Sequence, residues 1–184
     1  MKRKLDMFLS FFLLLLLLPL LFFIGISLKL SSPKEKVIFR QKRIGRGGKS
    51  FWIYKFRSFS EKTPDYVPAG KMQAENETLS FPAGFLKKSG LDELPQLINV
   101  LKGEMSLVGP RPLIKEEGSI HKKRMEAGIY KIRPGITGLA QIHGGNRISD
   151  QEKLFWDKQY LESVSFRLDL KICLCTLLQM LKNI

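Results

Sequence analysis

The stretch MFLSFFLLLLLLPLLFFIGISL, Met7–Leu28, decides the fold class, because it holds 22 residues without a single charge. As a straight helix it would be about 33 Å long, at roughly 1.5 Å per residue, which is enough to cross a bilayer. Length alone therefore fits a simple membrane-spanning helix. A cleaved signal peptide is disfavoured, because the apolar run is long and no small-x-small cleavage site follows it.

Two features favour a re-entrant hairpin over a spanning helix. Pro19 lies in the middle of the run, where a proline removes a helical hydrogen bond and bends the helix. Basic residues flank the run on both sides: Lys2, Arg3 and Lys4 before it, and Lys29, Lys34, Lys36, Arg40, Lys42 and Arg43 after it. Because basic residues prefer the cytoplasmic side, a spanning helix would put one cluster on the wrong face. We predict a membrane-anchoring re-entrant helix over residues 1–30, broken at Pro19, and a cytoplasmic domain over residues 31–184.

The composition predicts an anionic partner. The 184 residues include 31 lysines and arginines against 17 aspartates and glutamates, a formal net charge of +14. Such an excess suits nucleic acid, phosphate-rich substrates or an anionic membrane face. The chain has two cysteines, Cys173 and Cys175, which allow no disulfide framework.

Two strands are predicted directly after the apolar run. They are Val37–Arg43 and Phe51–Arg57, and the glycine-rich segment between them suits a hairpin turn. Lys55 and Arg57 alternate with Phe56, so we expect their side chains to share one face of the second strand. The polar segment Glu61–Phe81 is predicted to be a loop.

The stretch LDELPQLINVLKGEMSLVGPRP, Leu91–Pro112, carries two adjacent carboxylates, Asp92 and Glu93, at the start of a predicted helix. The buried face of that helix is predicted from its apolar positions, Leu94, Leu97, Ile98 and Leu101. Gly103 suits the helix end.

The carboxylates have two interpretations. Acidic residues in a first turn cap free N–H groups, and the spacing Ser89-x-x-Asp92 fits such a cap.

The second interpretation is catalytic. An ionised aspartate can attack phosphorus, and a neighbouring glutamate can help to hold a Mg²⁺ ion that shields a pyrophosphate. A carboxylate that approaches a diphosphate needs nearby cations, because the like charges repel each other. The candidates are Lys55, Arg57, Lys87, Arg111 and Arg133. Arg111 lies between two prolines, which restrict its backbone.

Three further helices are predicted towards the C-terminus. They cover Glu116–Gly128, Ser149–Ser163 and Leu168–Leu181, with Ser149 or Asp150 as the cap of the second. The last helix is apolar over most of its circumference. Its default interpretation is a core helix, and the alternative is a helix that lies in the membrane interface.

These residues together resemble the bacterial sugar transferase family, the small monotopic phosphoglycosyl transferases. The resemblance rests on the central stretch, on FRQKRIG and YKFRSF before it, and on RPGITGLAQ after it, and it covers nearly the whole chain. It implies a helix-rich mixed α/β fold: a monotopic membrane protein with a re-entrant helix hairpin, a small β-hairpin and interfacial amphipathic helices. It also implies a place on the cytoplasmic face of the cell (inner) membrane.

The family implies transfer of a sugar phosphate from a UDP-sugar to undecaprenyl phosphate, with Mg²⁺ and without nucleic acid. By motif, Asp92 would be the nucleophile and Glu93 its partner and a metal ligand, while Lys55, Arg57 and Arg111 would bind phosphates. Arg133, Thr137 and Gln141 would shape the site near the nucleotide or sugar. The sequence departs from the family with a lysine at Lys87, where arginine is frequent, and with glycine at the arginine position of the His143–Asn146 loop. A homodimer is possible.

Three alternatives stay open on the sequence. One is direct transfer in a ternary complex, in which the two carboxylates only hold Mg²⁺. Another is a membrane-tethered module that binds nucleic acid or anionic lipid without catalysis. The third is a scaffold subunit of a polysaccharide assembly complex, against which the intact motif argues.

Overall fold

The computed structural model describes residues 1–58 and 81–182. Its main elements are α1 (Lys2–Ser31), β1 (Ile38–Ile44), β2 (Ser50–Phe56), α2 (Phe81–Ser89), α3 (Gln96–Lys102), β3 (Ser106–Val108), α4 (Gly118–Glu126), β4 (Gly135–Thr137), α5 (Leu139–Ile142), α6 (Asp150–Ser163) and α7 (Phe166–Lys182). Short 3-10 turns complete it: η1 (Arg46–Gly48), η2 (Leu91–Glu93), η3 (Ile129–Lys131) and η4 (Gly145–Arg147). The helix-rich mixed α/β prediction is confirmed. The predicted loop Glu61–Phe81 lies outside the described residues except for Phe81, which begins α2.

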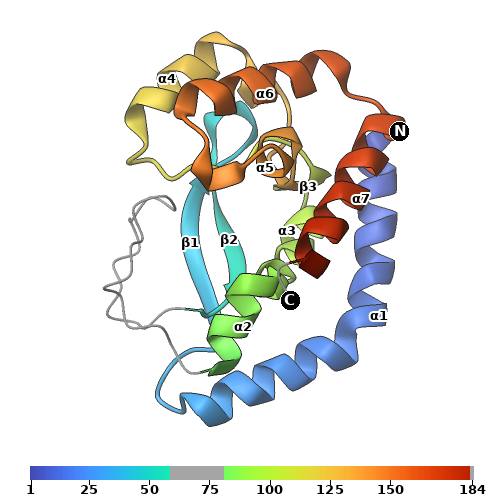
Figure 1. Cartoon of the computed structure of the whole chain (residues 1–184), viewed down its shortest axis with the longest axis vertical. Helices are drawn as coiled ribbons and strands as arrows, with labels where there is room; N and C mark the ends of the chain where they lie inside the picture. Colours follow the sequence, from blue (N-terminus) through green and yellow to red (C-terminus); the bar gives the residue numbers. More distant parts are fainter. Residues whose placement is uncertain (59–80, 183–184) are drawn as a thin grey trace.

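The apolar run forms one long helix, α1. Among the described residues it is the one helix long and apolar enough to cross a membrane. Pro19 lies inside it, and the ribbon changes direction part-way along, so that α1 follows one side of the molecule and then its lower edge (Figure 1). Most of its leucines and phenylalanines are exposed, and its buried hydrophobic residues are Ile24 and Leu28. The re-entrant topology stays a prediction.

The predicted hairpin is confirmed, with β1 and β2 antiparallel and Ile38 opposite Phe56. Strand β2 ends at Phe56, but the pairing with β1 continues for one residue, because the Arg57 amide donates to the Val37 carbonyl at 2.9 Å. The Arg57 guanidinium lies 5.9 Å from the ring of Phe39, which is the partner of Lys55 across the hairpin, and this contact agrees with the expectation that Lys55 and Arg57 share a face. Beyond the strand, the Arg57 side chain turns back towards the chain before β1: its Nε donates to the Lys36 carbonyl at 2.9 Å and its Nη1 lies 3.5 Å from Glu35 Oε2. Lys55 keeps the face that it shares with buried Ile53.

The two carboxylates are not helix caps. They lie in η2, which follows Gly90 (φ 73°), and α3 begins only after Pro95, with no side-chain cap on either turn. Ser89 instead donates its hydroxyl to the Phe85 carbonyl at 2.8 Å. The predicted cap is therefore wrong, because a left-handed glycine separates Ser89 from the turn that Asp92 was expected to start. Helix α3 ends at Gly103, as predicted.

The buried face of α3 also differs from the apolar pattern. Ile98 is exposed, whereas Asn99 is fully buried. The Asn99 side chain holds α3 to β2, because its Nδ2 donates to the Trp52 carbonyl at 2.7 Å and its Oδ1 accepts from the Tyr54 amide at 3.1 Å. These bonds fix the strand one residue before Lys55. A polar side chain that replaces strand pairing in this way leaves no apolar signal in the sequence.

Strands β3 and β4 form a parallel pair that joins two glycine-containing loops. Gly109 donates to the Thr137 carbonyl at 2.9 Å, and Gly135 donates to the Pro110 carbonyl at 3.0 Å. The backbones touch so closely that a Cβ on Gly135 would lie 2.0 Å from the Gly109 nitrogen. This contact fixes the segment that carries Arg111.

We expect the substitution Gly135→Ala to unfold this junction. The added methyl group has no space among backbone atoms, so the free energy of unfolding should fall by about 3 kcal/mol or more. Gly84→Ala is the matched control, because a Cβ there meets nothing within 4 Å and alanine favours a helix. Thermal unfolding of both variants in detergent measures the difference, and equal stability would contradict the packing argument.

The C-terminal helices were predicted in the right places. Ser149 caps α6 in a capping box with Glu152, as expected. Helix α7 is not a core helix, because Ile172 is its buried residue while a row of large apolar side chains is exposed: Phe166, Leu170, Leu174, Leu177, Leu178 and Leu181. The default interpretation is therefore wrong for α7, and the exposed row fits the alternative of an interfacial amphipathic helix.

Candidate active site

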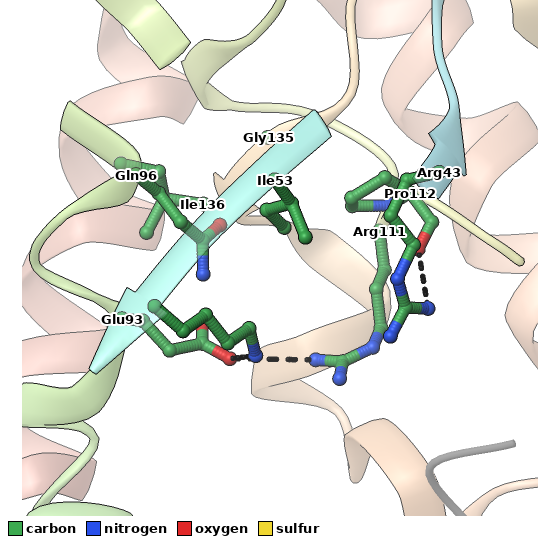
Figure 2. Close-up of a pocket in the computed structure, with 9 residues that line it drawn as sticks. Arg43, Ile53, Glu93, Gln96, Arg111, Pro112, Gly135 and Ile136 are labelled. Atoms are coloured by element: carbon green, nitrogen blue, oxygen red, sulfur yellow. Dashed lines mark hydrogen bonds and ion pairs between the residues drawn. The ribbon is translucent and has the colours of Figure 1, made fainter. Parts of the chain in front are cut away.

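Glu93 lies at the centre of a cluster of unlike charges. Its Oε1 accepts a hydrogen bond from Lys55 Nζ and lies 4.0 Å from Arg111 Nη1 (Figure 2). Burial alone would raise the pKa of Glu93, but the two cations outweigh it and lower this pKa to about 2. Glu93 is therefore an ionised carboxylate at neutral pH, and its position is fixed by β2 on one side and the Pro110–Pro112 segment on the other.

Asp92 lies in a different environment although it is the next residue. Its side chain is 8% exposed, and among the described residues it forms no ion pair. Burial raises the pKa of Asp92 to about 7, and the charge of Glu93 adds to this effect while Lys55 opposes it. A carboxylate that is weakly stabilised when ionised is the more basic and more nucleophilic of a pair. The environment thus separates the two acids into a fixed anion and a reactive carboxylate.

Arg43 is the residue of this site that the sequence did not single out. Its guanidinium is buried, its Nη1 donates to the Pro112 carbonyl at 3.2 Å, and its Nη2 donates to Gln41. Burial and then the nearby charge of Arg111 lower the pKa of Arg43 to about 10. Its Nε is buried and has no partner among the described residues. A buried cation that lies beside a second cation, and that pairs with no carboxylate in the described part of the chain, indicates a site for an anion.

Two pockets meet at these arginines. The first, a small cavity of about 10 Å³, is lined by Lys55, Glu93 and Gln96 together with Arg43 and Arg111 (Figure 2). The second, of about 30 Å³, shares both arginines and is lined by Arg124, Gln141, Asn146 and Lys153 among others. Arg124 Nη1 also donates to the Arg111 carbonyl at 2.7 Å, which holds the backbone between the prolines.

Gln141 is the predicted pocket residue that this geometry supports most directly. Both polar atoms of its amide are buried and have no hydrogen-bond partner among the described residues. A buried amide costs free energy unless it is paired, so its donor and acceptor are available to a bound ligand. Gln141 and the two arginines lie in the same pocket wall, so a ligand that bridges them would carry an anionic group and a hydrogen-bonding group.

The acids fit a Mg²⁺ ion that is shared with a substrate. No group of three or more histidine, cysteine, aspartate or glutamate side chains is found among the described residues, so the protein offers two carboxylates here. Mg²⁺ is commonly bound by one or two carboxylates together with substrate phosphates and water. Asp92 and Glu93 would hold the ion, and it would neutralise charge on a diphosphate.

Comparison with known proteins decides the family. The family model for bacterial sugar transferases matches residues 1–183. The chain belongs to the bacterial sugar transferase family. An uncharacterised sugar transferase of Bacillus subtilis, EpsL, is 38% identical over 98% of this chain and 87% of its own length. The exopolysaccharide production protein ExoY of Rhizobium meliloti is 34% identical over 96% of the chain and 83% of its own length.

A longer relative carries a more specific name. The UDP-glucose:undecaprenyl-phosphate glucose-1-phosphate transferase of Escherichia coli is 38% identical over 96% of this chain, which spans 39% of that protein. The family predicted from the sequence is thus confirmed. That prediction rested on the central stretch, the hairpin motifs and the RPGITGLAQ segment.

The other residues predicted for this sugar transferase do not line the pocket that contains Glu93. Arg57 pairs with Glu35, and Lys87 is exposed on the last turn of α2. The Thr137 hydroxyl lies 2.6 Å from that of Thr176, so it joins β4 to α7. Arg133 lines a separate pocket near the start of α1. Their roles in binding substrate stay predictions, and the sequence could not place them because each depends on a distant element.

Proposed function

We propose that the chain transfers a sugar 1-phosphate from a UDP-sugar to undecaprenyl phosphate, forming undecaprenyl-diphospho-sugar and UMP. The observation that carries the proposal is the division between Asp92 and Glu93, two adjacent carboxylates with opposite pKa shifts beside Arg43 and Arg111. Such a site combines a nucleophile with fixed positive charge for a diphosphate. The E. coli relative named for this reaction supports the substrate class, and the sugar is open.

The reaction has two displacement steps. A carboxylate oxygen of Asp92 attacks the phosphorus that carries the sugar, the bond from that phosphorus to the bridging oxygen breaks, and UMP leaves with the oxygen. An oxygen of undecaprenyl phosphate then attacks the same phosphorus. The aspartyl–phosphorus bond breaks, the Asp92 carboxylate is restored, and the new diphosphate linkage carries the sugar.

The surrounding cations make the first step possible. Lys55 and Arg111 keep Glu93 ionised and in place. Arg43 and Arg111, which line both pockets, bind the diphosphate and reduce its repulsion of Asp92. Gln141 contacts the nucleotide or sugar end of the donor in the second pocket.

The acceptor accounts for the apolar surface. Undecaprenyl phosphate has a charged head and a long apolar tail, so an enzyme that uses it needs its site at the membrane surface. Helix α1, as a re-entrant anchor with both basic flanks on the cytoplasmic side, and α7, with its exposed apolar row, would hold the site there.

The decisive experiment measures UMP release and a covalent intermediate. Detergent-purified protein is incubated with a panel of UDP-sugars, with and without undecaprenyl phosphate. We expect UMP release from at least one donor, and without acceptor we expect labelled sugar phosphate bound to the protein. Turnover without label after rapid quenching would favour direct transfer in a ternary complex. No release from any donor would overturn the enzyme proposal and favour a module that binds anionic lipid or nucleic acid.

The two-carboxylate site predicts that Mg²⁺ binds weakly without donor. One of the two carboxylates is already bound to Lys55, and donor phosphates would supply the remaining oxygens. Calorimetry should show Mg²⁺ affinity rising by about tenfold or more when a non-reactive UDP-sugar analogue is present. A chelator should abolish UMP release, and added Mg²⁺ should restore it. Full turnover in chelator would contradict the metal requirement.

A further inference from the structure

A third basic pocket lies beside the first turn of α1. Its volume is about 220 Å³, and five cations line it against one carboxylate, Asp6. The cations come from three distant parts of the chain: Lys2, Arg3, Arg46, Lys131 and Arg133. Its lining shares no residue with the pocket that contains Glu93, so it is distinct from the candidate active site.

Some of these cations have structural partners. Lys2 Nζ lies 2.5 Å from Asp169 Oδ2, and Arg3 donates to the Val100 and Leu101 carbonyls at the end of α3. These contacts explain both residues without a ligand, because Lys2 has a carboxylate partner and Arg3 binds carbonyls at the C-terminal end of a helix, where cations are favourable.

The remaining cations are not explained in this way. The side chains of Arg46 and Lys131 form no hydrogen bond or ion pair within the described part of the chain. Among the residues that the structure describes, Arg133 donates only its Nε, to the Gly103 carbonyl at 2.8 Å. Burial and then the charges of Arg3 and Arg46 lower the pKa of Arg133. Like charges that the fold holds together are stabilised by an anion placed between them.

The position of the pocket points to a membrane lipid. Asp6 is the last charged residue before the apolar run of α1, so the pocket lies where that run begins. Val164, which is 41% exposed, lines the pocket, and the exposed Phe166 begins α7 next to it. A basic hollow with an apolar rim at the end of a membrane helix matches a lipid headgroup and the start of its chains.

We propose that this pocket binds the phosphate group of an anionic phospholipid, separately from the transfer reaction. The phosphate interacts with Arg46, Lys131 and the free nitrogens of Arg133. A free phosphate ion would present the same anionic group to these cations. The apolar rim of the pocket favours a phospholipid over the free ion. Binding there would set the depth and tilt of α1 relative to the catalytic domain.

The test uses the full chain in a neutral detergent, with a chelator and no nucleotide sugar. The probes are short-chain phosphatidylglycerol, short-chain phosphatidylcholine and inorganic phosphate. The double variant Arg46→Gln/Lys131→Gln removes two exposed cations of the pocket. Lys122→Gln/Lys123→Gln on α4 is the matched control, since it removes the same charge from exposed residues that do not line the pocket.

We expect phosphatidylglycerol to bind more tightly than phosphatidylcholine, and its dissociation constant to rise about tenfold in the pocket variant but less than twofold in the control. Arg111→Gln should retain this binding, which separates the pocket from the active site. Equal losses in the two double variants, or equal affinity for both lipids, would overturn the proposal. Inorganic phosphate that competes at the same concentration as phosphatidylglycerol would support the phosphate site and assign it to a free ion. Because no donor is present, the outcome does not depend on the transfer activity.

Discussion

Replacement of Asp92 by asparagine should abolish turnover while stabilising the protein. An amide cannot attack phosphorus, so UMP release and the labelled intermediate should both fall by about a thousandfold or more. The loss should appear in the first step, before the acceptor is involved. Rapid-quench measurement of UMP release in the absence of undecaprenyl phosphate isolates that step.

The substitution should raise stability although it abolishes activity, because the folded protein disfavours the ionised form of Asp92. The pKa of Asp92 is about 7 in the folded protein, against an ordinary value of 3.8. The protonated form is favoured by folding, so stability is lost as the pH rises from about 4 to 7, and the full cost applies above pH 7. Asparagine removes this cost. In a chelator, Asp92→Asn should be more stable than the wild type by about 1–3 kcal/mol at pH 8, with little difference near pH 4.

Glu93→Gln provides the control for this pair. It also removes a carboxylate, but Glu93 is stabilised by Lys55 and Arg111, and its pKa is lowered rather than raised. Its loss leaves Lys55 without its partner, so this variant should be less stable than the wild type at pH 8. Near-normal turnover of Asp92→Asn would exclude Asp92 as the nucleophile. A fall in stability for both variants would contradict the difference between the two acids.

The sequence was sufficient for the residues whose roles are set by their neighbours in the chain. The apolar run, the glycine turn of the hairpin and the capping box at Ser149 are local signals, and each led to the observed element. The adjacent acids and Arg111 between its prolines are also local signals, and the structure brings Glu93 and Arg111 together, while their catalytic roles stay predictions. Lys55 was also found, because its place in a strand sets the face on which it lies.

The rest depends on contacts between distant segments. The capping interpretation failed because Gly90 starts a 3-10 turn, and only the folded chain shows that Asp92 is buried there. The partners of Arg57 are Glu35 and the Lys36 carbonyl, which lie before β1 and cannot be predicted from the pattern of β2. Asn99 is buried on α3 because it binds the backbone of β2, which no periodicity of α3 reveals. Such residues require knowledge of pairing partners.

Arg43 is the clearest example of such a residue, and its substitution should have a large effect on donor binding. In the sequence it is one of several basic residues at the end of a strand. The bridge from the Ile44 amide to the Leu113 carbonyl, at 2.8 Å, brings this strand end to Pro112 and so places Arg43 beside Arg111. The buried guanidinium then lines both pockets of the site.

We expect Arg43→Lys to weaken donor binding and spare acceptor binding. Lysine keeps the charge but loses the planar fork that suits a diphosphate, so KM for the UDP-sugar should rise about tenfold while KM for undecaprenyl phosphate changes little. Arg43→Gln should lower kcat/KM for the donor by about a hundredfold, since it removes a buried positive charge near the diphosphate.

A purely structural role for Arg43 predicts a different pattern. Loss of its bond to the Pro112 carbonyl would then lower stability and both KM values would rise together. The affinity for UMP, measured by calorimetry, and the thermal stability together separate the two roles. If Arg43 binds phosphate, Arg43→Lys should lose UMP affinity without a fall in stability. Arg40→Gln on the same strand is the control, since its exposed guanidinium lies 5.4 Å from the Tyr54 ring and does not line either pocket. Unchanged UMP affinity in both Arg43 variants would remove Arg43 from the phosphate site, and Arg111 would then be the arginine that binds the diphosphate beside Asp92.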